Sequence, residues 1–210
     1  ENAEANYTEQ LIAMKNFPSY YYPPALPETF QSRSYFDLAE EAHLYLCTQS
    51  LFKFLPSFDS ILAEILQQDP LGIVILLEGR YSSWTEQLKQ RLQRSLPAMH
   101  SRIHFIPKEK TKADDDFYSL LALVDVLFDP HPFSGGISTL DVLAIGTPIV
   151  SLPTPLPMGL LTSACYKLMG LEEYIPHSKK EFLELALKTA CDKVFREKFN
   201  HDILANHSKI

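Results

Sequence analysis

Residues 127–141 read LFDPHPFSGGISTLD, and this stretch predicts a strand, a proline-rich turn, a glycine-rich loop and the start of a helix. Gly135 and Gly136 let the backbone approach a ligand closely, because they carry no side chain. The helix is expected to begin near Ile137, where unpaired backbone N–H groups and the positive end of the helix dipole favour a phosphate. The loop and helix start together therefore predict an anion-binding turn.

The side chains of the same helix start allow two interpretations. In the first, Ser138 and Thr139 offer hydroxyl donors to a phosphate, and Asp141, expected in the first helical turn, accepts hydrogen bonds from ribose hydroxyls. In the second, the stretch is only a capped helix after a turn, with Ser134 or Ser138 as the cap and Asp141 placed to suit the helix dipole. The stretch matches neither GxGxxG nor a Walker A loop, which disfavours a dinucleotide-binding or ATPase site.

On both sides of this stretch, short apolar runs alternate with segments whose apolar residues recur at helical spacing. Buried strands that alternate with helices are typical of a parallel sheet with helices on both faces, and such sheets bind ligands at the carboxyl ends of their strands. We therefore expect a Rossmann-like α/β fold. The predicted strands are 43–47, 71–77, 102–106, 126–129 and 148–152, and the predicted helices are 58–68, 84–96, 117–124, 138–145, 160–169 and 180–199.

Lys53 lies in the loop QSLFKFLP (49–56), which follows the first predicted strand. It is a lone cation between aromatic residues, and a solvated lysine is the simplest interpretation. A cation at the carboxyl edge of the sheet could instead neutralise a departing diphosphate. Three acidic residues, Asp114–Asp116, could suggest a metal motif, but they stand just before a predicted helix, where capping and the helix dipole explain them better. No metal site is predicted.

The composition argues against several classes of protein. The formal net charge of −7 disfavours nucleic-acid binding, although a local pocket could still hold a small phosphorylated ligand. Cys47, Cys165 and Cys191 are far apart and form no CxxC pair, so neither a zinc site nor a disulfide framework is indicated. No apolar run approaches the length of a membrane span. We expect a cytoplasmic protein.

Residues 1–40 are rich in aromatic residues and prolines, as in Phe17-Pro18-Ser19-Tyr20-Tyr21-Tyr22-Pro23-Pro24. Such dense prolines prevent long helices, and the aromatic content favours an ordered segment laid over a neighbouring surface. We expect residues 1–40 to be a connector from a preceding lobe and residues 41–210 to form the sheet domain with its C-terminal helices. The chain begins with Glu1 and not with Met, so a fragment of a longer protein is expected.

Two motifs together resemble a known family: FDPHPFSGGISTLDVLAIGTPIVSLP (128–153) and the QSLFKFLP loop before it. They are similar to the C-terminal half of the O-linked N-acetylglucosamine transferase family, which also includes SPINDLY-type fucosyltransferases and bacterial HMW1C-like N-glycosyltransferases. The resemblance spans about residues 40–195. It implies the C-terminal lobe of a two-lobed GT-B glycosyltransferase, with the nucleotide sugar in this lobe and the acceptor in the cleft between the lobes.

The resemblance also implies roles for single residues. Lys53 matches the lysine that contacts the diphosphate and is needed for activity, and Asp141 matches the acid that binds the ribose. Gly136, Ile137 and Ser138 match the helix start that holds the phosphates. With Gly135 of the glycine-rich loop, they complete the expected phosphate-binding segment.

Three positions depart from the family pattern. Ser50 takes the place of a glutamine near the phosphates. Phe117 stands where the animal enzymes carry a histidine beside the nucleotide, so stacking is retained and a hydrogen bond is lost. Ile137 replaces a hydroxyl residue, although its backbone N–H can still serve. These departures leave the identity of the sugar open.

The implied reaction is inverting and independent of metal, with Lys53 and the helix start stabilising the charge on the departing diphosphate. The expected partners are a nucleotide sugar, a protein or peptide acceptor and the N-terminal lobe, and no cofactor beyond the donor is expected. The alternative is a binding module that holds a nucleotide or a partner without turnover. A nucleotide-sugar epimerase is disfavoured because no dinucleotide fingerprint follows the first strand.

Overall fold

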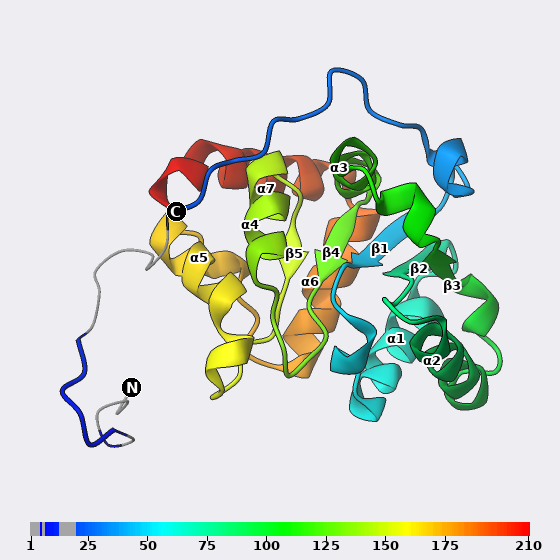
Figure 1. Cartoon of the computed structure of the whole chain (residues 1–210), viewed down its shortest axis with the longest axis horizontal. Helices are drawn as coiled ribbons and strands as arrows, with labels where there is room; N and C mark the ends of the chain where they lie inside the picture. The colour runs from blue at the N-terminus through cyan, green and yellow to red at the C-terminus, as the bar shows by residue number, and fades with distance from the viewer. Residues whose placement is uncertain (1–4, 6, 13–19) are drawn as a thin grey trace.

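The computed structural model describes residue 5, residues 7–12 and residues 20–210. It confirms the predicted α/β fold: five parallel strands in the order β3-β2-β1-β4-β5, with helices on both faces (Figure 1). The strands are β1 (His43–Cys47), β2 (Gly72–Leu77), β3 (Ile103–Ile106), β4 (Val126–Phe128) and β5 (Ile149–Val150). The helices are α1 (Pro56–Gln68), α2 (Ser82–Ser95), α3 (Asp114–Leu123), α4 (Ile137–Ile145), α5 (Leu161–Met169), α6 (Lys179–Cys191) and α7 (Lys193–Asn206).

The strands are largely buried on both faces, which explains their mostly apolar sequences. The edge strand β3 is half-buried at His104 and Phe105. Successive residues of a strand point to opposite faces, so β1 directs Leu44 and Leu46 into one core cluster and Tyr45 and Cys47 into the other. The first cluster is covered by α3, α4, α5 and α7, and the second by α1, α2 and α6. No helix in the described part of the chain is long and apolar enough to span a membrane.

Two predicted helices need correction. The single helix expected over 180–199 is wrong, because α6 and α7 are separated at Asp192, whose backbone is extended. The Asp192 side chain accepts a 3.0 Å hydrogen bond from the Phe195 N–H and so caps α7. Helix α3 begins at Asp114, so the three acidic residues form its first turn and do not precede it; no side chain caps its start.

Residues 20–40 of the predicted connector run across α4 and α3 (Figure 1). The Gln31 amide donates to Asp116 at 3.0 Å, and its backbone N–H donates to Ser119 Oγ at 3.0 Å. Phe36 and Leu38 enter the core cluster on this face of the sheet. The rest of the predicted connector falls partly on residues 1–4, 6 and 13–19, outside the described residues. The division of the chain at residues 40 and 41 stays a prediction.

The edge strand β5 pairs with β4 on one side only. On its other side, the buried Tyr166 hydroxyl donates to the Ile149 carbonyl at 2.8 Å and accepts from the Ile149 N–H at 3.0 Å. A side chain of α5 thus supplies both hydrogen bonds that a further strand would make.

Replacing Tyr166 by Phe would leave two buried backbone groups of Ile149 unpaired. Buried unpaired groups each cost about 1–3 kcal/mol, so we expect Tyr166→Phe to lower the free energy of unfolding by at least about 1–3 kcal/mol. Urea unfolding measures this change. Tyr22→Phe, which removes an exposed hydroxyl, is the control. Equal stability of the two variants would contradict this role for Tyr166.

Candidate nucleotide-binding site

The loops that follow β1 and β4 lie side by side at the carboxyl edge of the sheet. Strands β1 and β4 are neighbours, and strand order reverses between them, since β2 and β3 lie beyond β1 while β5 lies beyond β4. In open α/β sheets this switch point is where ligands bind. Loop 48–55 after β1 and loop 129–136 after β4 therefore form the candidate site.

Lys53 ends the short helix η3 (Leu51–Lys53) in the first of these loops. Its ammonium donates a 2.6 Å hydrogen bond to Gln49 Oε1 and a 3.3 Å hydrogen bond to the Ser134 carbonyl in the second loop. The half-buried cation thus reaches from the β1 loop to the segment just before α4. The structure accordingly places Lys53 at the edge of the sheet where the sequence predicted a cation.

Gln49 is a residue that the sequence analysis missed. Its side chain is buried, and its amide nitrogen donates a 3.1 Å hydrogen bond to Ser138 Oγ in the first turn of α4. One glutamine therefore connects Lys53 with Ser138. The signal available in the sequence was a polar residue two positions after a buried strand, at the edge where ligands bind.

The predicted Ser50 lies beside this network but does not enter it through its side chain. Ser50 is exposed, and its carbonyl accepts the backbone N–H of Lys53 at 2.9 Å. Its side chain makes no capping hydrogen bond to η3. A phosphate contact by Ser50 stays a prediction.

Helix α4 begins at Ile137, as the glycine-rich stretch predicted. Its N-cap residue is Gly136, so the alternative in which Ser134 or Ser138 caps the helix is wrong. A Cβ atom on Gly135 would lie 2.1 Å from Thr139 Oγ1 and 2.9 Å from Gln49 Nε2, so this position has room only for glycine. A Cβ on Gly136 would meet no atom within 4 Å, and the Ile137 side chain is 73% exposed. The start of the helix is therefore open to a ligand.

The β4 loop is held in place from its other side by residues 154–161. The Ser134 N–H and hydroxyl both donate to the Met158 carbonyl, at 2.7 Å and 3.1 Å, and Ser134 Oγ accepts from the Leu161 N–H at 3.2 Å. A Cβ on Gly159 would lie 2.4 Å from the Pro132 carbonyl oxygen. This close packing fixes the backbone that leads into α4.

Asp129, whose carboxyl is buried, is the first residue of this loop, directly after β4. Thr162 donates a 2.6 Å hydrogen bond to its Oδ2, while Oδ1 has no hydrogen-bond partner in the described part of the chain. Burial raises the pKa of Asp129 from 3.8 to about 6, against the stabilising effects of Thr162, Ser151, the Lys53 charge and the Gly135 N–H. The Lys53 charge thus favours the ionised form of this buried carboxyl.

Asp141 lies in α4 and Phe117 in α3, and neither residue enters the hydrogen bonds of Lys53 and Gln49. Asp141 lies in the second turn of α4, one turn later than predicted, and accepts a 2.5 Å hydrogen bond from Tyr21 of the N-terminal segment. Burial, followed by this hydrogen bond, raises the pKa of the Tyr21 hydroxyl well above its ordinary value. Phe117 is half-buried in α3, with its ring 5.9 Å from that of Tyr118. Their contacts with a nucleotide stay predictions.

The architecture defines a Rossmann-like α/β domain of the type found in GT-B glycosyltransferases. The solved structures it resembles include a mutant O-GlcNAc transferase of Thermobaculum terrenum, with a TM-score of 0.71, 21% identity and coverage of 81% of this chain and 33% of that one. WaaG, a glycosyltransferase involved in lipopolysaccharide biosynthesis, has a TM-score of 0.59, 16% identity and coverage of 84% of this chain and 45% of that one.

The structural comparisons show the fold, and the sequence comparisons show the family. The model of glycosyl transferase family 41 matches residues 24–209, and the chain belongs to this family. A UDP-N-acetylglucosamine–peptide N-acetylglucosaminyltransferase of Caenorhabditis elegans is 28% identical over 162 residues, which are 77% of this chain. The matched part is 14% of that relative, so the chain corresponds to a small portion of it. The resemblance stated from the sequence is thereby confirmed.

The raised pKa of Asp129 predicts how stability depends on pH. The folded chain holds more protons than the unfolded chain between pH 3.8 and about 6, so this carboxyl lowers stability as the pH rises through that window. Across the whole window, the free energy of unfolding falls by up to about 3 kcal/mol because of this carboxyl. Asp129→Asn removes this titrating group. We therefore expect the free energy of unfolding of the variant, measured with urea, to rise relative to that of the original chain between pH 4 and pH 7.

Glu28→Gln, which removes one exposed negative charge, is the control for this measurement. If the free energy of unfolding of Asp129→Asn and of the original chain changes with pH in the same way, Asp129 does not cause the pH dependence.

Proposed function

We propose that this chain is the donor-binding lobe of an inverting glycosyltransferase that transfers a sugar from a nucleotide diphosphate sugar to protein side chains. One observation carries the proposal: Gln49 connects the Lys53 ammonium to Ser138 at the open start of α4. A cation and unpaired backbone N–H groups thus face the same space at the switch point of the sheet, which suits a diphosphate.

In the proposed reaction, an acceptor nucleophile attacks the anomeric carbon from the face opposite the diphosphate. The bond between the anomeric carbon and the diphosphate oxygen breaks, its electron pair stays on the diphosphate, and the configuration is inverted. The proton of the acceptor passes to a base supplied by the other lobe or by the substrate. Lys53 and the N–H groups of Ile137 and Ser138 stabilise the developing negative charge. These groups supply the positive charge at the leaving group, so we propose that this step needs no metal ion.

The donor is proposed to be UDP-N-acetylglucosamine or a UDP-hexose, with a protein or peptide as acceptor. The support is membership of family 41 and the name of the Caenorhabditis elegans relative, which is a UDP-N-acetylglucosamine–peptide transferase. Asp141 is proposed to bind the ribose, in which case Tyr21 shares or yields its hydrogen bond to this carboxylate when the nucleotide binds.

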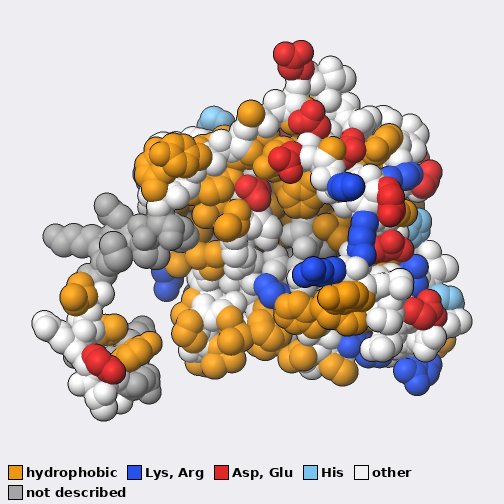
Figure 2. Space-filling model, viewed as in Figure 1, with side chains coloured by type: hydrophobic (Ala, Val, Ile, Leu, Met, Phe, Trp, Pro, Cys, Tyr) orange, Lys and Arg blue, Asp and Glu red, His pale blue; other side chains and the backbone are white. Residues whose placement is uncertain are grey.

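The N-terminal lobe and the acceptor are proposed to cover the carboxyl edge of the sheet. Phe52, Ile137 and Met158, each on a loop or helix start at this edge, are 66%, 73% and 53% exposed. In Figure 2, hydrophobic side chains gather along the lower edge of the view, where these loops lie below the strands of Figure 1. Such a patch is typical of an interaction surface. Residues 1–40 would then lead from that lobe into residues 41–210.

A binding module without turnover is the second candidate. It is favoured by the isoleucine at position 137, which offers no hydroxyl, and by Phe117, which cannot donate a hydrogen bond. This module would hold a nucleotide or a partner, and it differs from the first candidate in that no sugar transfer depends on Lys53.

Calorimetric titration with UDP, and with GDP and NAD in parallel, tests the donor site. We expect saturable binding of UDP, weakened about 10- to 100-fold by Lys53→Ala because a charged hydrogen bond to the diphosphate is lost. Asp141→Ala should also weaken it. Lys112→Ala, at an exposed lysine after β3, is the matched control. A preference for GDP would instead point to a fucosyl donor.

Transfer activity separates the two candidates in a chain that carries both lobes. A catalytic Lys53 predicts a fall in transfer of roughly 100- to 1000-fold in Lys53→Ala, with an unchanged fold. Transfer that persists at the original rate would remove Lys53 from the mechanism. Absence of transfer by the original two-lobed chain, together with normal UDP binding, would favour the binding module.

A further inference from the structure

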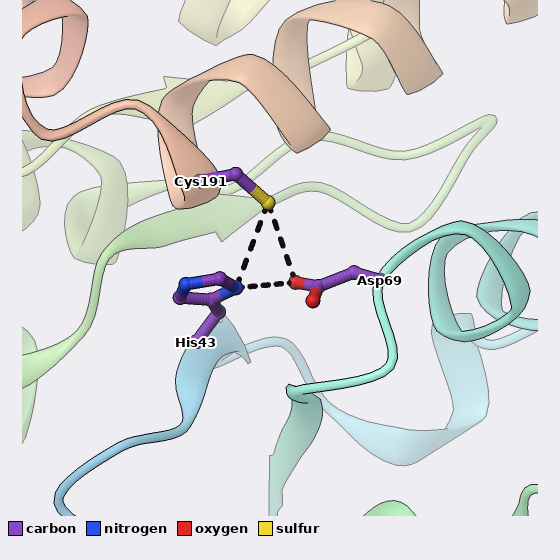
Figure 3. A group of neighbouring side chains, drawn as sticks. All are labelled: His43, Asp69 and Cys191. Atoms are coloured by element: carbon purple, nitrogen blue, oxygen red, sulfur yellow. Dashed lines mark hydrogen bonds and ion pairs between the residues drawn. The ribbon is translucent and has the colours of Figure 1, made fainter.

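Three side chains from distant parts of the sequence meet at the amino edge of the sheet, opposite the candidate nucleotide site. His43 is the first residue of β1, Asp69 follows α1, and Cys191 is the last residue of α6 (Figure 3). His43 Nδ1 lies 2.8 Å from Asp69 Oδ2, and Cys191 Sγ lies 3.5 Å from each of these atoms. Imidazole, carboxylate and thiolate are the three zinc-binding groups of proteins.

The distances among the three atoms resemble those around a tetrahedral metal ion. Bonds of about 2.0–2.1 Å to nitrogen, 2.0–2.2 Å to oxygen and 2.3 Å to sulfur place tetrahedral ligand atoms about 3.3–3.6 Å apart. The two distances from Cys191 Sγ already fall in this range. Only the His43–Asp69 distance must lengthen, by about 0.5 Å. This lengthening is expected because the hydrogen bond between His43 and Asp69 would be replaced by one bond from each residue to the metal.

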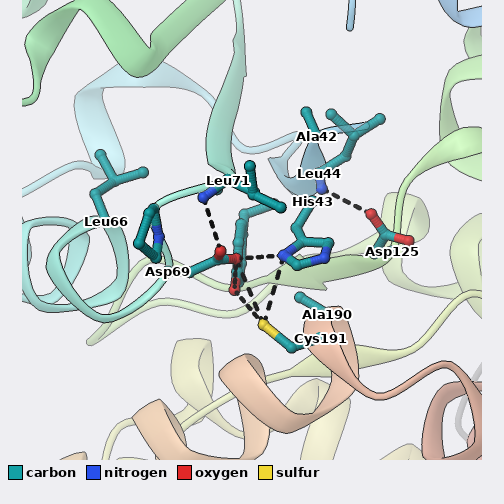
Figure 4. Close-up of polar contacts among 12 residues, drawn as sticks. Ala42, His43, Leu44, Leu66, Asp69, Leu71, Asp125, Ala190 and Cys191 are labelled. Atoms are coloured by element: carbon teal, nitrogen blue, oxygen red, sulfur yellow. Dashed lines mark hydrogen bonds and ion pairs between the residues drawn. The ribbon is translucent and has the colours of Figure 1, made fainter. Parts of the chain in front are cut away.

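The carboxylate of this triad is held in place by its surroundings (Figure 4). Asp69 is buried; its Oδ1 accepts the Leu71 N–H at 3.0 Å, and its Oδ2 accepts the Tyr45 hydroxyl at 2.8 Å. The backbone of His43 is fixed by pairing of β1 with β2 and by a 3.1 Å hydrogen bond from its N–H to the Leu71 carbonyl. Hydrogen bonds that orient a ligand in this way are typical of metal sites.

A reactive cysteine is a poorer interpretation of the same cluster. Nucleophilic cysteines have a lowered pKa, whereas burial, and then the neighbouring Asp69 carboxylate, raise the pKa of the Cys191 thiol.

We propose that His43, Asp69 and Cys191 bind a divalent transition-metal ion, with Zn²⁺ the best match to this set of ligands. Cys191 is exposed and the His43 side chain is 28% exposed, so the fourth position of a tetrahedral ion would open to solvent and hold water. The ion would tie the end of α6 to β1 and to the loop between α1 and β2. Within the described residues this is the group of side chains whose geometry suits a metal.

Cobalt(II) is the probe for this site, because it occupies zinc sites and reports sulfur ligation by its absorption. The reduced chain, first freed of metal with EDTA, is titrated with Co²⁺ and then with Zn²⁺. We expect one equivalent of Co²⁺ to bind with a thiolate charge-transfer band and tetrahedral visible bands, and Zn²⁺ to displace it. Bound metal should also raise Tm.

Cys191→Ser should abolish the charge-transfer band, and His43→Gln should weaken metal binding at least about tenfold. Both side chains are partly exposed, so these variants test the site without removing the buried Asp69. His201→Gln, at an exposed histidine of α7, is the matched control and should bind as the original chain does. The proposal is overturned if the original chain gives no such band, if the band survives in Cys191→Ser, or if His43→Gln binds the metal unchanged.

Discussion

The buried side chain of Gln49 is the contact on which the candidate nucleotide site depends. It accepts from the Lys53 ammonium at one end and donates to Ser138 at the other. Through it, the loop after β1 and the start of α4 become one surface, although the two segments are 89 positions apart in the chain. The carbonyl of Ser134 adds a second contact to the same cation. The close fit of Gly135 against Thr139 and Gln49 holds the turn between them.

The parallel sheet separates two chemically different edges. At the carboxyl edge, strand ends and the start of α4 present backbone N–H groups and a cation, which favours an anion. At the amino edge, strand starts meet the end of α6, where His43, Asp69 and Cys191 present a set of ligands that favours a cation. The same strand, β1, contributes to both edges: His43 begins it, and Gln49 and Lys53 follow its end. A metal bound at one edge would therefore lie apart from the diphosphate at the other.

The sequence predicted the sheet well because most strand residues are apolar and buried, and most helices bury one periodic face. It did not predict the end of α6 at Asp192. The helical pattern continues through this residue, but its extended backbone separates α6 from α7. It also could not show that Gln49 joins Lys53 to Ser138, or that Tyr21 reaches Asp141, since both contacts depend on tertiary packing. The metal triad was invisible for the same reason, with His43 and Cys191 separated by 148 positions and no local motif between them.

A crystal structure of the chain with UDP would show whether Lys53 and the start of α4 bind the diphosphate. We expect diphosphate oxygens within hydrogen-bonding distance of Lys53 Nζ and of the backbone N–H groups of Ile137 and Ser138, with the ribose near Asp141. The ammonium would then have exchanged at least one of its contacts with Gln49 and Ser134 for a phosphate oxygen. A nucleotide bound elsewhere, or a diphosphate directed away from α4 while Lys53 keeps both contacts, would show that these groups do not form the donor site.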